Sequence, residues 1–166
     1  MHSEGQRHRL PQLARRELED LREATEEACD HLDAIGMPDT LIHNDLQLEN
    51  VIPSMTRCYF IDWDQAGIGN PFLALEQLRV QLPESETGSL VSGYRSRWAR
   101  VLRPEAMDAG LALIAPIAIA VQLCSYMASL RVDATLRTLE LRHLRSLTRQ
   151  LHRALQAIRR SQRKSA

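Results

Sequence analysis

A chain of 166 residues, with 44% hydrophobic and 25% charged side chains, is long enough to bury the core of one soluble domain. The three cysteines, Cys29, Cys58 and Cys124, are odd in number and far apart, which excludes a disulfide framework and predicts buried, unpaired thiols in a reducing cytoplasm. The net charge is zero, but residues 131–166 carry ten basic and two acidic side chains, which we expect to form the solvent face of a helix rather than a nucleic-acid site.

The first predicted element is an amphipathic helix. Residues 1–12 are polar, lack a hydrophobic signal region, and are predicted to be a loose N-terminus. Apolar residues then recur at three- and four-residue steps over about Leu13–Leu32, which indicates a helix, and Gly36 and Pro38 end it.

Short strands are predicted next. Thr40–Ile42 suits a strand, and Val51–Ile52 with Cys58–Ile61 suits a hairpin around a turn at Pro53-Ser54. Gly67, Gly69, Asn70 and Pro71 predict a loop, so that the chain between these strands and the helices would be irregular.

The remaining elements are predicted to be helices. They cover about 72–82, 89–102, 104–130 and 135–160, with a loop at 83–88. Tyr94 and Trp98 share one helix face, and a leucine stripe marks the last helix: Leu136, Leu139, Leu144, Leu147, Leu151, Leu155 and Ile158.

The most apolar stretch, Ala109–Val121, is too short to span a membrane and contains Pro116, which we expect to interrupt it; we therefore expect a buried core helix and no membrane partner. The predicted fold class is mainly α with a small β-hairpin (α+β), with one domain over 13–160 and a basic tail over 161–166.

A group of polar residues around the predicted hairpin carries the chemistry. His43-x-Asp45 follows an apolar pair, Asn50 comes five residues after Asp45, and Asp62 follows a second apolar strand. In kinases, an aspartate in such a loop takes the proton of the attacking hydroxyl, while an asparagine and a second aspartate hold the metal ions that bridge the nucleotide phosphates. The complete set of residue types and spacings therefore predicts phosphoryl transfer.

The segments 43–50 and 61–64 resemble the catalytic signature of the aminoglycoside phosphotransferase and choline kinase family, whose protein-kinase-like enzymes phosphorylate small-molecule hydroxyls with ATP. The resemblance implies that Asp45 is the catalytic base and that Asn50 and Asp62 bind Mg²⁺ and, through it, ATP. Asp64 is either a further acidic group at the metal or a solvated charge. His43 belongs to the catalytic motif, where we expect it to brace the loop rather than to titrate.

The sequence departs from this family in ways that leave the substrate open. Four positions of the motif carry residues that are less common in this family: Asn44, Gln47, Glu49 and Asn70. The resemblance covers residues 13–160 and implies the C-terminal lobe of such an enzyme.

Two parts of a complete kinase site are not found in this sequence. Only Gly67-x-Gly69 approaches a glycine-rich loop, and the single lysine is Lys164. We therefore expect weak or no activity from the chain alone, with an N-terminal lobe supplied separately or a homodimer completing the apolar face. The alternative is a non-catalytic binding or assembly module that keeps the kinase-like scaffold.

Overall fold

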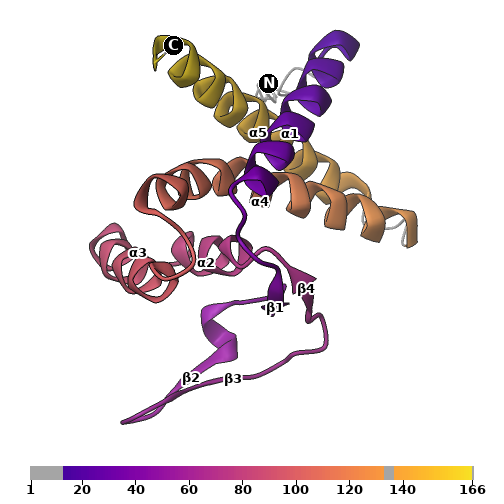
Figure 1. The fold of residues 1–166 in the computed structure, drawn as a ribbon. Coiled ribbons are helices and arrows are strands. Elements are labelled where there is room, and N and C mark those ends of the chain that lie inside the picture. Colours follow the sequence, from indigo (N-terminus) through magenta and orange to yellow (C-terminus); the bar gives the residue numbers. More distant parts are fainter. Residues whose placement is uncertain (1–12, 133–136, 166) are drawn as a thin grey trace, which may run out of the picture. The chain divides into compact units, whose positions relative to one another are not determined.

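The computed structural model describes residues 13–132 and 137–165, with side chains described for 13–128 and 143–160. Its elements confirm the predicted class, mainly helical with small antiparallel sheets (Figure 1). In chain order they are α1 (Arg15–Ala34), β1 (Thr40–Ile42), the 3₁₀ turn η1 (Leu48–Asn50), β2 (Val51–Pro53), β3 (Cys58–Phe60), β4 (Gly67–Gly69), α2 (Phe72–Arg79), α3 (Glu84–Trp98), α4 (Pro104–Val132) and α5 (Arg137–Ser165).

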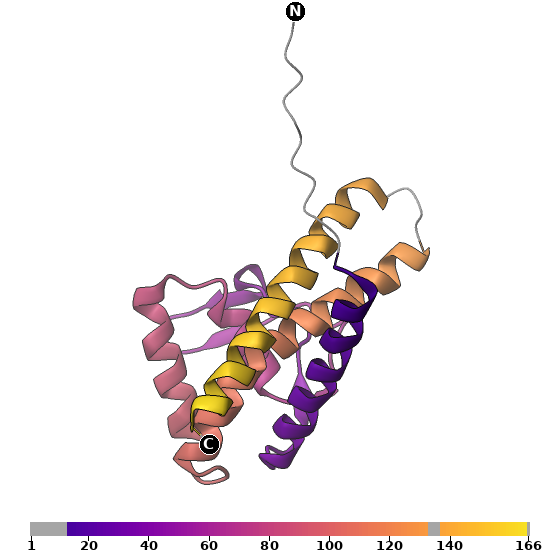
Figure 2. The same cartoon turned by 90° about the horizontal axis from the view of Figure 1, so that it is seen from above.

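The chain divides into two compact units. The central unit consists of residues 27–118, and the terminal unit combines the residues up to Glu26 with those from Ile119 onward. Helices α1 and α4 each contribute to both units. The predicted loose segment 1–12 lies outside the described residues. The basic tail predicted from residue 161 continues α5, which runs as one helix to Ser165 (Figure 2).

Small residues allow close packing in the core of the central unit. Phe72, at the start of α2, is fully buried, and a Cβ added at Gly110 of α4 would lie 2.5 Å from its ring. Because glycine has no side chain, the ring can lie against the helix backbone at this point. The other buried hydrophobic residues of the unit are Ala28, Leu32, Met37, Ile42, Leu46, Leu75, Leu102, Met107, Leu113, Ile114 and Ile117.

Two small sheets flank the motif residues. Strands β2 and β3 form the predicted antiparallel hairpin, with Ile52 opposite Tyr59. Strand β1 pairs with β4, where Ile42 lies opposite Gly67, so the prediction of a loop at 67–71 was wrong for Gly67–Gly69. A Cβ at Gly69 would lie 2.9 Å from the side chain of Ile42. Glycine, a poor strand former by propensity, is used here because a neighbouring side chain lies against the backbone.

Helix boundaries lie within a few residues of the predictions except at α3, which begins before the predicted residue 89 and ends at Trp98 instead of near residue 102. The region 83–88 is not a loop, because α3 begins at Glu84 directly after Pro83. Acidic residues in a first turn interact favourably with the positive end of the helix dipole, and Glu84 and Glu86 occupy that turn. The rings of Tyr94 and Trp98 lie 6.1 Å apart between centroids, which confirms their shared face.

The long apolar helix α4 starts at Pro104 as predicted, but Pro116 lies within it and does not interrupt it. Over Pro104–Ala128 the helix is long and apolar enough to cross a membrane, judged by length and composition alone, and 28% of its most apolar window is buried. Among the side chains of α4 that the structure describes, which end at residue 128, the buried positions lie before residue 118, whereas Val121 and Met127 are exposed. The predicted core helix is therefore buried in its first half.

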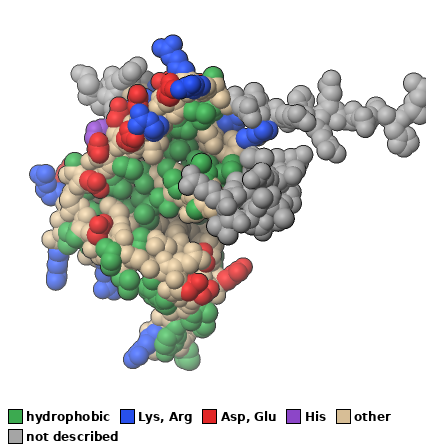
Figure 3. All heavy atoms as spheres, turned by 90° about the vertical axis from the view of Figure 1, so that its right-hand side faces the viewer, with side chains coloured by type: hydrophobic (Ala, Val, Ile, Leu, Met, Phe, Trp, Pro, Cys, Tyr) green, Lys and Arg blue, Asp and Glu red, His purple; other side chains and the backbone are tan. Residues whose placement is uncertain are grey.

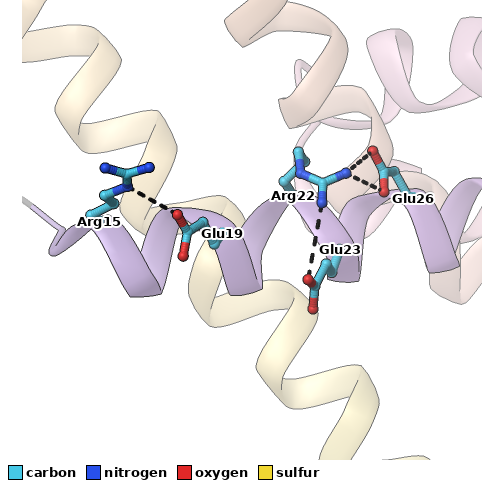
Figure 4. A network of polar contacts seen from close by, with 5 residues as sticks. All are labelled: Arg15, Glu19, Arg22, Glu23 and Glu26. Atoms are coloured by element: carbon cyan, nitrogen blue, oxygen red, sulfur yellow. Dashed lines mark hydrogen bonds and ion pairs between the residues drawn. The ribbon is translucent and has the colours of Figure 1, made fainter.

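The terminal unit contains the predicted leucine stripe of α5. Leu147, Leu151 and Leu155 are buried, while Leu136 and Leu139 lie outside the described side chains. In α1, Leu21 and Ala24 are buried, and the solvent face carries ion pairs of Arg15 with Glu19 and of Arg22 with Glu23 and Glu26 (Figure 4). Exposed pairs of this kind contribute little stability, so the buried apolar side chains hold the unit together.

All three cysteines are unpaired and exposed, so the prediction that they would be buried was wrong. Cys29 follows Ala28, which takes the core-facing position of α1, and Cys58 lies in β3, whose residues are all exposed.

Candidate active site

The predicted catalytic loop, residues 43–50, leaves β1 at a buried histidine and ends in η1. His43 is 2% exposed. Asn44 takes a left-handed backbone conformation, with φ of 63°. Asparagine tolerates this region better than most residues, because its side chain can hydrogen-bond nearby backbone. The side-chain Nδ2 of Asn44 donates to the carbonyl of Gln65 at 3.0 Å, so this turn is tied to the segment that follows the second motif.

The two halves of the motif meet at the peptide groups of Ile61. The Ile61 N–H donates to the carbonyl of Asn50 at 3.0 Å, and the Ile61 carbonyl lies 2.7 Å from Nε2 of His43. A carbonyl can only accept, so we assign the proton to Nε2. This is the bracing contact predicted for His43. The residue directly before Asp62 is thereby held by both ends of the catalytic loop.

Asn50 also connects the predicted base, Asp45, to the predicted metal-ligand positions. Its side-chain Nδ2 donates to the backbone carbonyl of Asp45 at 3.0 Å. That hydrogen bond involves the side-chain nitrogen. The side-chain oxygen Oδ1, which would bind a cation, takes no part in it. An amide oxygen and carboxylates are the hard donors that suit Mg²⁺. The residue types and this orientation of Asn50 therefore fit the predicted ion.

Asp62 has a backbone φ of 63°, in the left-handed region that few residues other than glycine adopt. Strained conformations of this kind persist where surrounding contacts impose them. The next residue supplies such contacts: the Trp63 ring lies 4.7 Å from that of His43 between centroids, and its Nε1 donates to the Phe60 carbonyl at 2.8 Å. The backbone is thus constrained on both sides of Asp62.

The three carboxylates differ in exposure. Asp45 is half-buried, and its Oδ1 lies 3.5 Å from Nε2 of Gln47, whereas Asp62 and Asp64 are exposed. Asp64 lies in the turn closed by the bond from the Ala66 N–H to the Trp63 carbonyl. Among the described side chains, residues 13–128 and 143–160, no three His, Cys, Asp or Glu form a metal-binding group by themselves. The ligand roles of Asn50, Asp62 and Asp64 stay predictions.

Two glutamines that the motifs did not single out also contact the loop. Gln77 of α2 and Gln81, just beyond it, each hydrogen-bond the backbone of residues 44–48. The sequence offered one signal for these two residues: they are four positions apart, next to apolar Leu78 and Val80, and so lie on one face of the predicted helix. Asn70, one of the departures from the family pattern, accepts the Phe72 N–H at 3.0 Å and so holds the start of α2.

One of three comparisons with known proteins gives a match. No curated protein and no solved structure gives a significant match. A family model described as the phosphotransferase enzyme family matches residues 2–109, well over half of the chain. The matched region includes the catalytic loop, the second motif and the helix α2 that contacts them, and the chain therefore belongs to the phosphotransferase enzyme family.

Proposed function

We propose that this chain provides the C-terminal catalytic lobe of an ATP-dependent phosphotransferase that acts on the hydroxyl of a small molecule, similar to aminoglycoside and choline kinases. The observation that carries the proposal is the position of Ile61, whose N–H and carbonyl are both bound by residues of the catalytic loop. Through this residue the half of the site with Asp45 and Asn50 is joined to Asp62.

In the proposed reaction, Asp45 orients the acceptor hydroxyl and takes its proton while the new O–P bond forms and the bond to ADP breaks. Asn50 and Asp62 would hold Mg²⁺, with Asp64 as a candidate further ligand. When bound, ATP would supply the phosphoryl group, and Mg²⁺ would offset part of the negative charge on the phosphates. His43 keeps the Ile61 carbonyl in place and takes no part in proton transfer.

A second component is part of the proposal, because a lysine and a glycine-rich loop must grip the phosphates from the opposite side. The hairpin is a suitable docking surface for it. Ile52, Tyr59 and Trp63 are between 44% and 53% exposed. Figure 3 shows hydrophobic side chains exposed at the foot of the view, where the hairpin lies. An isolated two-stranded hairpin is marginal in water, so a partner would stabilise it.

Charge indicates which partner fits this surface. Glu49, Asp62 and Asp64 are exposed beside the hairpin, against the single Arg57 at its turn. A separate N-terminal lobe would bring a lysine toward these carboxylates, whereas a second copy of the hairpin repeats the acidic residues. We therefore favour a separate lobe over a homodimer. We place the reaction in the cytoplasm, where ATP and Mg²⁺ are available and three exposed thiols stay reduced.

The metal site can be tested on the 166-residue chain with Mn²⁺, a paramagnetic substitute for Mg²⁺. We expect low concentrations of Mn²⁺ with ATP to broaden the amide resonances of Asn50, Ile61 and Asp62. Asp62→Ala should remove this broadening, because it deletes the carboxylate ligand. Asp33→Ala, at an exposed position of α1, is the matched control and should leave it unchanged. Broadening that persists in Asp62→Ala would refute the metal site and with it the proposed function.

A further inference from the structure

Gln77 and Gln81 form a double clamp on the catalytic loop. The Leu46 N–H donates to Oε1 of Gln77 at 3.2 Å, and Nε2 of Gln77 donates to the Asn44 carbonyl at 2.7 Å. The Leu48 N–H donates to Oε1 of Gln81 at 2.8 Å, and Nε2 of Gln81 donates to the Leu46 carbonyl at 2.9 Å. Each carboxamide thus pairs with the loop through one donor and one acceptor, as the edge of a strand would.

The clamp encloses Asp45. The peptide groups before and after this residue, represented by the Asn44 carbonyl and the Leu46 N–H, bind the same carboxamide. Two peptide orientations are then set, so the direction in which the Asp45 Cα–Cβ bond leaves the backbone is set as well. Only a side chain that carries a donor and an acceptor at the same reach can make this pair of bonds, which glutamine does and glutamate at neutral pH does not.

The helix that carries the clamp is itself fixed. Phe72 and Leu75 are 0% and 3% exposed, and the buried Glu76 pairs with Arg79 through two hydrogen bonds. Gln81 is also tied to the helix end through a bond to the Gln77 carbonyl. The position of Asp45 therefore depends on the core through α2 and the two glutamines.

We propose that Gln77 and Gln81 are positioning residues for Asp45. This proposal rests on the proposed function, because it assigns the positioning a role in phosphoryl transfer. Misplacing a reacting group by a fraction of its bonding distance slows a reaction without weakening the binding of a substrate held elsewhere. Loss of the clamp should therefore lower kcat and leave the KM for ATP unchanged.

The first test measures the clamp itself by amide hydrogen exchange in the 166-residue chain. In Gln77→Met with Gln81→Met, we expect the Leu46 and Leu48 amides to lose protection by roughly tenfold or more, since their acceptors are removed. The Ile61 amide, which bonds to Asn50, should keep its protection. Gln122→Met, at an exposed position of α4, is the matched control. Unchanged exchange at Leu46 and Leu48 would overturn the clamp.

The second test measures catalysis in the assembly that transfers phosphate from ATP. The double variant should lower kcat about 10- to 100-fold with the KM for ATP within about twofold. Leu113→Ala, a buried position in α4, gives a destabilised control. If it lowered kcat equally at equal loss of stability, or if the double variant kept full kcat, the positioning role would be wrong. If the wild-type chain shows neither transfer nor Mn²⁺ broadening, the proposed function fails, and the exchange measurement still decides whether the clamp exists.

Discussion

The catalytic loop and the hairpin follow each other along the chain but are held in opposite ways. The loop over 44–50 is tied by side chains of α2 and by the backbone of Ile61. The hairpin of β2 and β3 has almost no buried side chain, and its tip residue Met55 is fully exposed. The chain thus constrains one side of the site by its own contacts and leaves the other side exposed, where we propose that a partner binds.

This difference matches the division of labour in phosphoryl transfer. A base and metal ligands must be held within a fraction of an ångström, and the residues that we propose for these roles lie on the constrained side. The grip on the β- and γ-phosphates closes over the nucleotide and belongs on the open side. The following predictions test each side of the comparison, from the largest expected effect to the smallest.

Removing the proposed base, Asp45, from the constrained side should abolish most of the catalytic activity. In an assembly that transfers phosphate to a hydroxyl acceptor, Asp45→Ala should lower kcat by about 100- to 10,000-fold, the range for loss of a general base. Steady-state kinetics measure this, with Asp39→Ala as the control, because Asp39 is exposed ahead of β1. We expect the 166-residue chain alone to transfer little or no phosphate. Robust Asp45-dependent turnover by the chain alone would contradict the need for a partner and would point to an arginine as the phosphate grip.

Phe72 anchors α2 in the core, and the site beside its ring at Gly110 should not accept a larger side chain. A Cβ in Gly110→Ala would lie 2.5 and 2.6 Å from Cε2 and Cζ of Phe72, a ring with no free space. We expect a loss of about 1–3 kcal/mol in the free energy of unfolding, measured with urea. Gly93→Ala in α3 is the control, because nothing lies within 4 Å of its Cβ and alanine favours a helix interior by roughly 0.5–1 kcal/mol. Equal stabilities of the two variants would show that Phe72 does not anchor the helix.

The open side should lose association when it is made polar. Ile52 and Tyr59 face each other across the hairpin, and both are about half exposed. Replacing both by serine should weaken binding at this surface roughly tenfold or more, because about 1–3 kcal/mol of apolar burial is lost. Sedimentation at high protein concentration measures self-association. Val121→Ser is the control, because Val121 is also about half exposed but lies outside the hairpin. A wild-type chain that stays strictly monomeric would exclude the homodimer and leave the separate lobe as the partner.

The smallest effect concerns Tyr94, whose ring lies 5.8 Å from that of Phe72 between centroids. Burial raises the pKa of Tyr94 above the usual value of about 10, and the contact with Trp98 offsets only part of this. Above pH 10 the unfolded chain releases this proton first, so stability should fall as the pH rises. Tyr94→Phe should change the free energy of unfolding by less than about 0.5 kcal/mol at pH 7. It should also remove part of the decline at pH 10.5; an unchanged decline would show that this tyrosine is not responsible.

Elements encoded by local periodicity were predictable from the sequence. Apolar spacing and turn residues located Thr40–Ile42, the hairpin and the leucines of α5. Strand β4 was missed because glycines at 67 and 69 suit a loop by propensity, and only the neighbouring Ile42 explains why they form a strand. The start of α3 was missed because Pro83-Glu84 suits a loop and equally the first turn of a helix.

Prediction of the site was limited in the same way. Asp45, Asn50 and Asp62 could be proposed from the sequence because their residue types and spacing suit phosphoryl transfer, and their roles stay predictions. Gln77 and Gln81 were not proposed, because their bonds join residues 31 to 35 positions apart. Their i, i+4 spacing places them on one helix face but does not show what that face binds. Long-range polar contacts of this kind depend on the folded path of the chain, which hydrophobic pattern alone does not specify.

The pairing of β1 with β4 also bears on how the protein folds. Thr40 pairs with Gly69, so one short ladder closes the loop that contains both motifs. The clamping glutamines follow within a dozen residues of that ladder. The contacts that build the site therefore all lie within residues 40–81, whereas the terminal unit must join the segment up to Glu26 with the segment from Ile119 onward. Closing the shorter loop costs less entropy. We expect this region to acquire its native geometry early in folding, before helix α5 completes the terminal unit.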